Sequence, residues 1–169
     1  MAFARQYDLS EVKEMLAIYN GNQLKTATGT TPAAHASGHV GSDFRDMRTR
    51  VNTPGQTRVD GTYITEDAQA KATQYMLNSP AGQLALQTLD AGQASAVITI
   101  PLPANTYKMA AVHDRSNVGP GLAGHVGKNN AARGGAGADT VNSFAASGFM
   151  KVYKAVGGLL QIQTSYPIA

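Results

Sequence analysis

Two apolar segments near the C-terminus, separated by a pair of glycines, constrain the fold of this chain most strongly. The segments cover residues 149–156 and 159–166, and Gly157-Gly158 lies between them. Two β-prone segments joined by two glycines predict a β-hairpin with a two-residue turn. The C-terminal part of the chain is therefore expected to form an antiparallel sheet.

Direct pairing across a two-residue turn fixes which side chains of this hairpin face one another. It sets Tyr153 opposite Ile162 and Lys151 opposite Thr164. Alternation divides the second strand into a face with Leu160, Ile162, Thr164 and Tyr166 and a face with Leu159, Gln161, Gln163 and Ser165. One end of the hairpin would present Lys151, Thr164 and Tyr166 together, although an ordinary edge hairpin with polar residues at its open end also fits this pattern.

The N-terminal part has the pattern of one amphipathic helix followed by a polar connection. The helix is expected over residues 8–20, where Asp8 and Glu11 fit a capping box. Residues 22–37 contain mostly Asn, Gln, Thr, Ser, Ala and Gly, and they read as a linker. We therefore predict two parts, an N-terminal helix and linker over residues 1–32 and one main domain over residues 33–169.

Two further helices are predicted in the middle of the chain. Thr65 is expected to cap the first, which has Ala68, Ala72, Tyr75 and Met76 on one face. Ser79-Pro80 starts the second, which Gly92 ends, and its expected apolar side consists of Leu84, Leu86 and Leu89. Both helices have a structural explanation, so we expect no chemistry there.

The strand patterns come after these helices. Residues 52–62 read as a loop, residues 96–100 as a buried strand closed by Pro101, and residues 107–113 as the next strand. Helices first and an antiparallel sheet later predict an α+β domain.

Composition excludes several classes of function. The chain has no cysteine, which rules out disulfides, a thiolate nucleophile and a cysteine-based zinc site. The net charge of +3 is mildly basic and favours a polyanionic partner without proving one. We expect neither a signal peptide nor a membrane span, because no apolar run has the required length or flanks.

The segment 38–50 combines a histidine with clustered arginines. His39 lies on a glycine-flanked turn, and a short helix is expected to begin near Ser42 and to carry Arg45, Arg48 and Arg50. An imidazole titrates near neutral pH, and an arginine fork binds a phosphate in two places. A base beside a phosphate clamp is what cleavage of RNA requires. The alternative is a solvated basic helix after an ordinary turn.

A second histidine shares the local motif of the first. The tetrapeptide Gly-His-Val-Gly occurs at residues 38–41 and again at 124–127, which makes His125 a rival for His39. His125 lies in a long glycine-rich stretch, residues 114–142, that is expected to be a functional or mobile loop. We expect no metal site, because His35 and His39 lack a third ligand of suitable spacing.

From about residue 33 to 167 the sequence resembles the bacterial ribonuclease A-like toxin domain at the C-terminal end of contact-dependent inhibition and other polymorphic toxins. The similarity consists of the histidine turn at residues 39–41, Arg50 eleven positions after His39, the helix start at residues 61–67 and the terminal strand at residues 164–167. The tryptophan that usually follows the third helix in that family is absent.

The resemblance implies a ribonuclease A-like fold without disulfides over residues 33–169. It also implies an endoribonuclease that needs no metal or cofactor, with His39, Arg50, Thr164 and Tyr166 as the catalytic residues. Lys151, His125 and Arg48 are our candidates for further contacts with RNA. The resemblance further implies delivery into the cytoplasm of a competing bacterium and a cognate immunity protein, and tRNA is among the candidate targets.

The chemistry of such a reaction assigns a role to each side chain. His39 would take the proton of the ribose 2′-hydroxyl, which attacks the adjacent phosphate, while Arg50 and Lys151 would stabilise the charge of the phosphorane. The products would be a 2′,3′-cyclic phosphate and a 5′-hydroxyl. His125, His113 and Tyr166 are alternative candidates for the acid that protonates the leaving group.

Two other functions fit the sequence. One is a toxin nuclease of the EndoU type, which would use a second histidine in place of Thr164 and Tyr166. The other is a non-enzymatic, Gly/Ala-rich structural or assembly protein, which would form regular oligomers and tolerate substitution of His39 and Arg50.

Overall fold

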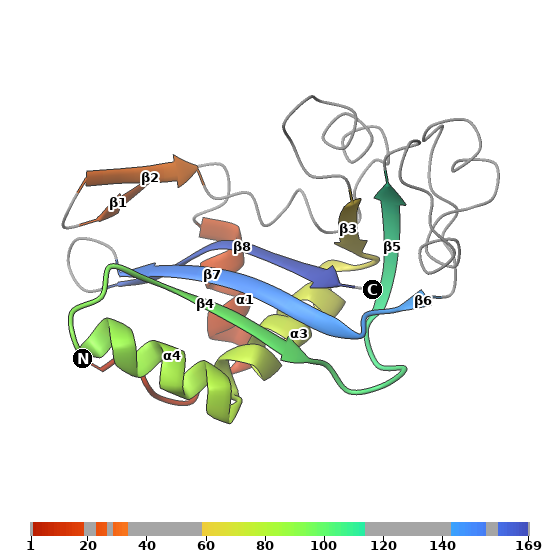
Figure 1. The fold of residues 1–169 in the computed structure, drawn as a ribbon, viewed down its shortest axis with the longest axis horizontal. Helices are drawn as coiled ribbons and strands as arrows, with labels where there is room; N and C mark the ends of the chain where they lie inside the picture. Colours follow the sequence, from red (N-terminus) through yellow and green to blue (C-terminus); the bar gives the residue numbers. More distant parts are fainter. Residues whose placement is uncertain are drawn as a thin grey trace.

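The computed structural model describes residues 2–18, 23–26, 29–33, 59–113, 143–154 and 159–168 (Figure 1). In chain order the elements are α1 (Leu9–Ile18), β1 (Gln23–Thr26), β2 (Gly29–Ala33), β3 (Val59–Tyr63), α3 (Glu66–Asn78), α4 (Pro80–Asp90), β4 (Ser95–Pro101), β5 (Lys108–His113), β6 (Ser143–Phe144), β7 (Ser147–Lys154) and β8 (Leu160–Ile168). Each strand pairing among them is antiparallel, and the predicted α+β class is confirmed.

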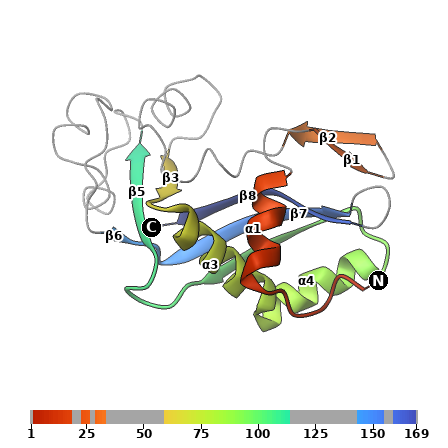
Figure 2. The ribbon, with the colours of Figure 1, turned by 180° about the vertical axis from the view of Figure 1, so that it is seen from behind.

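The sheet that carries most of the core has the strand order β4-β7-β8, and helices cover one of its faces. Figure 2 shows α1, α3 and α4 on the same side of this sheet. The side chains between the two layers are fully or almost fully buried, and they include Val12, Met76, Leu86, Ile98, Met150 and Ile162. Burial of this apolar layer is the main favourable contribution to folding.

The helix α1 begins where the sequence predicts it. The Glu11 N–H group donates to Asp8 Oδ1 at 2.8 Å, so the carboxylate caps the first turn as expected. The second half of the predicted capping box is replaced, because the Glu11 carboxylate forms an ion pair with Arg5. Val12 and Met15 are buried in the core that the later elements also form.

The caps of α3 and α4 agree with the prediction. Thr65 Oγ1 accepts from the Ala68 N–H group at 3.1 Å, and Ser79 Oγ accepts from the Gly82 N–H group at 3.0 Å. Pro80 is the first residue of α4, where its missing N–H group leaves no hydrogen bond unmade. Two adjacent helices are therefore fixed at their starts by side chains that are recognisable in the sequence.

The predicted apolar faces of these two helices are partly wrong. Leu84 is 65% exposed and Tyr75 is 43% exposed, whereas Leu86 and Met76 are fully buried. At about 100° per residue, Leu84 lies on the opposite side of α4 from Leu86, and Tyr75 lies about a quarter turn from Met76. The sequence spacing predicts these side chains in the core, but they point away from the sheet and are therefore exposed.

Two regions predicted as connections contain strands. Within the predicted linker over residues 22–37, β1 and β2 form a small antiparallel hairpin, and within the predicted loop over residues 52–62, β3 pairs with β5. The first hairpin is almost entirely polar, so it lacks the apolar alternation that reveals a strand. The helix expected after Ser42 lies outside the described residues.

The two strands predicted before the hairpin are present as β4 and β5. β4 is an edge strand of its sheet and is not buried on both faces as expected. Ile98 and Ile100 point into the core, whereas Val97 is 52% exposed.

The two strands of the C-terminal hairpin are confirmed, and their register is partly as predicted, whereas the turn predicted at Gly157-Gly158 lies outside the described residues. Lys151 lies opposite Thr164, but Tyr153 lies opposite Gln161 instead of Ile162. The difference arises because β8 contains one extra residue, Gln163, between the partners of Lys151 and Val152. This is a β-bulge, in which two residues of one strand oppose one residue of the other.

The bulge changes which side chains of β8 share a face. Ile162 pairs with the buried Val152, so it faces the helices, whereas Thr164 pairs with Lys151 and faces the other way. The predicted common face of Leu160, Ile162, Thr164 and Tyr166 is therefore wrong. The last two of these residues are on the side of the sheet away from the helices.

The N-terminal segment packs against the helices instead of extending away from them. The N–H groups of Phe3 and Ala4 donate to the carboxylate of Asp90 at 2.7 and 3.0 Å, and Tyr7 N–H donates to Asn78 Oδ1 at 2.8 Å. Residues 2–18 thus share the main core, and the boundary between residues 32 and 33 stays a prediction. None of the described helices is long and apolar enough to cross a membrane.

Candidate functional site

The face of the β4-β7-β8 sheet that points away from α1, α3 and α4 carries the described part of the predicted site. We call it the distal face. Because directly paired residues of antiparallel strands point to the same side, the register arranges this face in rows that run across β4, β7 and β8. Three adjacent rows concern the site: the first is Thr99–Phe149–Tyr166, the central one is Val97–Lys151–Thr164 and the third is Ser95–Tyr153–Gln161. A further row, Pro101–Ser147–Ile168, lies beyond the first.

The central row holds a cation beside a buried hydroxyl. Lys151 is partly buried, and its Nζ lies 5.1 Å from the centre of the Tyr153 ring. Thr164 is only 5% exposed, and its Oγ1 has no hydrogen-bond partner among the residues that the structure describes. Leaving a buried hydroxyl unpaired costs about 1–3 kcal/mol. A buried polar group without a partner calls for an explanation, and a catalytic or binding role is one of those known in proteins.

The first row presents an aromatic surface. The rings of Phe149 and Tyr166 stack with their centres 4.7 Å apart and their planes inclined by 19°. Both side chains are only partly buried. Unpaired bases of RNA are commonly bound by stacking on such rings. This row is therefore suited to contact with a nucleobase.

The third row contains a second unpaired buried atom. Gln161 is 7% exposed, and its Oε1 accepts no hydrogen bond within the described parts of the chain. An amide oxygen is an acceptor for N–H and O–H groups. No sequence signal reveals this position, because simple alternation predicts Gln161 on the opposite face from Thr164.

Contacts on the other side of β8 hold this strand in place. Ser165 Oγ and Thr73 Oγ1 share a hydrogen bond of 2.8 Å, and Gln69 Nε2 donates to the Ser165 carbonyl oxygen at 3.0 Å. All three side chains are buried. Because Ser165 lies between Thr164 and Tyr166, these bonds from α3 also fix the positions of those two residues.

The structure brings together only part of the predicted site. Lys151, Thr164 and Tyr166 lie on the distal face, in two adjacent rows. The other four predicted site residues, His39, Arg48, Arg50 and His125, lie outside the described residues. The role of each residue in catalysis or binding stays a prediction, and so does the choice of acid, although His113 is located at the end of β5.

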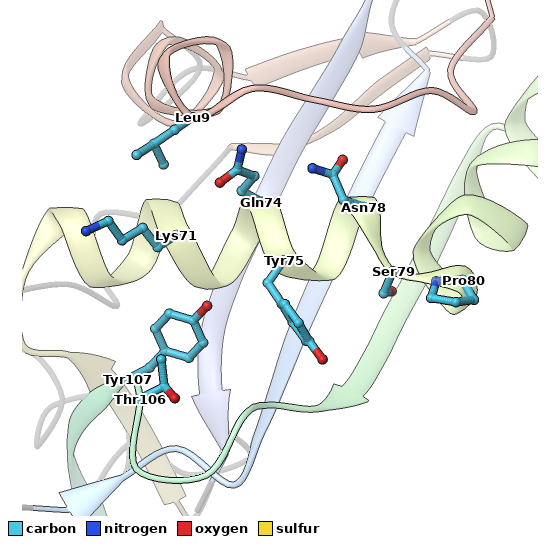
Figure 3. Close-up of a pocket in the computed structure, with 9 residues that line it drawn as sticks. All are labelled: Leu9, Lys71, Gln74, Tyr75, Asn78, Ser79, Pro80, Thr106 and Tyr107. Carbon is cyan, nitrogen blue, oxygen red and sulfur yellow. The ribbon is translucent and has the colours of Figure 1, made fainter.

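A groove of about 700 Å³ lies elsewhere, between α3 and the segment before β5 (Figure 3). Tyr75 and Tyr107 project into it from opposite sides, and Lys71 lies at one end, where it pairs with Asp67 at 2.7 Å. Burial raises the pKa of Tyr107. The sequence of α3 and α4 predicts no chemistry in this region.

The two side-chain amides of this groove already have partners in the protein. The side-chain amides of Gln74 and Asn78 donate to the Tyr7 carbonyl oxygen at 3.0 and 2.9 Å. These bonds hold the N-terminal segment against α3. The groove therefore has a structural explanation, and the unpaired atoms of the distal face make that face the stronger candidate.

Metal binding has no candidate among the described residues. In the ranges that the structure describes, no group of three or more His, Asp or Glu side chains converges on a common point. The three adjacent rows of the distal face instead offer the Lys151 cation, the unpaired Thr164 hydroxyl, the Gln161 amide and three aromatic rings. These groups suit recognition of an anion with attached planar rings.

Comparison with known proteins gives little similarity. No protein-family model matches this chain, and no curated protein matches it. One solved structure is similar, the crystal structure of the CdiA-CT/CdiI complex from Y. kristensenii 33638. A chain of that complex superposes with a TM-score of 0.48 and 13% sequence identity, covering 79% of this chain and 96% of that chain. A likeness of this extent is too weak to support an argument about function.

Proposed function

We propose that this chain is a metal-independent endoribonuclease of the ribonuclease A-like class that acts as a toxin in interbacterial competition. The observation that carries the proposal is the distal face, where Lys151 lies beside Thr164 and the buried Thr164 hydroxyl has no partner within the described residues. An ammonium group and a hydroxyl donor are suited to the oxygens of a phosphate. Tyr166, in the adjacent row, supplies a ring for the attached base.

The reaction begins with loss of a proton from the ribose 2′-hydroxyl. His39 takes this proton, the 2′-oxygen forms a bond to phosphorus, and the bond from phosphorus to the 5′-oxygen breaks. The leaving oxygen receives a proton from an acid, for which His125, His113 and Tyr166 are the candidates. Arg50 and Lys151 stabilise the additional negative charge of the phosphorane, and Thr164 donates to one of its oxygens.

The biological role rests on the resemblance of the sequence motifs. A toxin of this class is delivered into a competing bacterium and acts on RNA in the cytoplasm, where tRNA is a candidate target. The producing cell would need an immunity protein that blocks the site. We expect that protein to cover the distal face, because this would exclude RNA from Lys151 and Thr164.

Cleavage of RNA in EDTA tests the proposed reaction. The wild-type protein is expected to produce 2′,3′-cyclic phosphate ends without a divalent metal and to leave DNA intact. Replacement His39→Ala should lower the rate by about 10²–10⁴-fold, which is the usual contribution of a general base. His35→Ala is the matched control, since it removes a neighbouring histidine to which the reaction assigns no role.

The same assay distinguishes the alternatives. Loss of activity in His125→Ala together with full activity in Thr164→Val would favour an EndoU-type nuclease. A folded wild-type protein that cleaves no RNA would count against both nucleases and favour a structural role.

A further inference from the structure

The first, central and third rows of the distal face lie in an order that matches a phosphate and the two nucleosides attached to it. The cation and hydroxyl of Lys151 and Thr164 form the middle row, and rows with aromatic rings lie on both sides. Side chains on one face of a strand are about 7 Å apart from row to row. A phosphate in the middle row would thus place its two nucleosides over the flanking rows.

The proposed reaction involves only one of these flanking rows. Tyr166 and its stacking partner Phe149 accept one base, whereas Tyr153 and Gln161 have no part in it. Yet Gln161 has the same unusual property as Thr164, a buried polar atom without a partner within the described ranges. Two such atoms in adjacent rows of one sheet face suggest a common cause.

The bulge at Gln163 accounts for their proximity. Gln161 and Thr164 are separated by an odd number of positions, so in a regular strand they would point to opposite faces. The extra residue places both on the distal face, in the rows of Tyr153 and Lys151. Bulges often direct side chains toward functional sites in this way.

Tyr153 complements the amide with a ring. Its side chain is partly buried, and the Lys151 ammonium lies 5.1 Å from the ring centre. A base stacked on this ring would lie beside the position expected for the phosphate. The Gln161 oxygen would accept a hydrogen bond from an N–H group at the edge of that base.

We propose that Tyr153 and Gln161 form a second nucleoside subsite, so that the distal face binds the nucleosides on both sides of the phosphate. The inference rests on the proposed function for the identity of the ligand as RNA. It extends that function by assigning base recognition to Gln161 and stacking to Tyr153.

Two kinds of ligand are needed for the test. Dinucleotides that differ in one base report on cleavage, and a labelled 2′-O-methyl oligonucleotide, which lacks the attacking hydroxyl, reports on binding. Gln161→Met keeps the length of the side chain and removes the amide, and Gln163→Met makes the same change at the bulge. The thermal midpoints of all variants are recorded to confirm that they are folded.

Gln161→Met is expected to raise KM and the Kd of the oligonucleotide about three- to tenfold, the usual effect of one lost hydrogen bond. The preference among bases should change on one side of the cleaved bond only, and kcat should change little. Gln163→Met should leave the preference unaltered. Tyr153→Ala should weaken binding about tenfold, as expected for loss of one stacked base.

The outcomes separate this proposal from the proposed function. If the wild type cleaves RNA and neither Gln161→Met nor Tyr153→Ala alters preference or affinity, the subsite is refuted and the ribonuclease stands. If the wild type cleaves nothing but binds the oligonucleotide through these two residues, the subsite stands and the ribonuclease is refuted. Absence of both cleavage and binding overturns both. Tyr153→Ala keeps the test decisive if loss of the buried amide unfolds the chain.

Discussion

Thr164 and Thr73 lie on opposite sides of the β4-β7-β8 sheet, Thr164 on its distal face and Thr73 on the helix α3. The hydroxyl group of Thr73 has hydrogen-bond partners, and that of Thr164 has none among the described residues. Thr73 Oγ1 donates to the Gln69 carbonyl oxygen at 2.7 Å and shares a bond with Ser165 Oγ, whereas Thr164 Oγ1 has no partner in the described part of the chain. A satisfied hydroxyl stabilises the fold, and an unsatisfied one opposes it. The same residue type therefore has different consequences at the two positions.

Replacement of each threonine by valine tests this difference. Thr73→Val should lower the free energy of unfolding by about 1–3 kcal/mol, because it leaves Ser165 without its partner. Thr164→Val should leave stability unchanged or raise it by about 1 kcal/mol, while a lost bond to a charged phosphate lowers kcat/KM roughly tenfold or more. Urea denaturation and RNA cleavage measure the two effects. A large loss of stability in Thr164→Val would contradict the unpaired state of its hydroxyl.

At the scale of elements, α3 and α4 meet at a close approach of backbone. Ser79 ends the first helix and caps the second, so α4 starts directly against the last turn of α3. A Cβ atom at Gly82 would lie 1.9 Å from the Met76 carbonyl oxygen. Only glycine fits at this position, because any side chain would clash with the backbone of α3.

Gly82→Ala should destabilise the protein by about 1–3 kcal/mol or more, because the two helices must move apart. This opposes the gain that alanine usually brings to a helix. Gln87→Ala, at an exposed position of α4, is the control and should change stability by less than about 0.5 kcal/mol. Thermal denaturation of the two variants provides the comparison, and equal midpoints would contradict the close contact.

The sequence predicted elements whose signals are local and missed features that depend on distant partners. Thr65 and Ser79 cap helices through residues three positions ahead, so their roles are readable from the chain. The exposure of Leu84 depends on where the sheet lies, and the strands β1 to β3 are held by backbone bonds that side-chain patterns do not reveal. The bulge at Gln163 also left no signal in the alternation, which is why the faces of β8 were predicted wrongly.

At the scale of the whole molecule, the first residues of the described chain are bound to a distant helix end. Asp90, at the end of α4, accepts the N–H groups of Phe3 and Ala4, and this brings Phe3 into the core. Hydrogen bonds from these two groups hold the pKa of Asp90 below its ordinary value of 3.8. The charged carboxylate is thus favoured in the folded state.

The sign of this shift predicts how acid affects the N-terminal segment. Because the folded-state pKa is depressed, the stabilisation is complete above pH 3.8 and is lost as the pH falls through the lower folded-state value. Asp90→Asn should lower the thermal midpoint at pH 7, and the difference from the wild type should shrink below that range. A difference that stays constant down to pH 2 would contradict this linkage.

The bulge in β8 also has a consequence for how this chain can vary in length. Ile162 pairs with Val152 and Thr164 pairs with Lys151, so the residues on both sides of Gln163 already have consecutive partners on β7. Deletion of Gln163 would therefore give a regular antiparallel pairing in which each remaining residue of β8 keeps its partner. Thr164 and Tyr166 would stay on the distal face, and the deletion would remove the additional local twist and the buried Gln163 side chain with its contact. A single-residue deletion elsewhere within the paired part of β8 would shift the pairing of the residues between the deletion and Gln163 by one position, even if the bulge were lost to compensate. Genetic variation in this strand is therefore expected to be tolerated first at this one position.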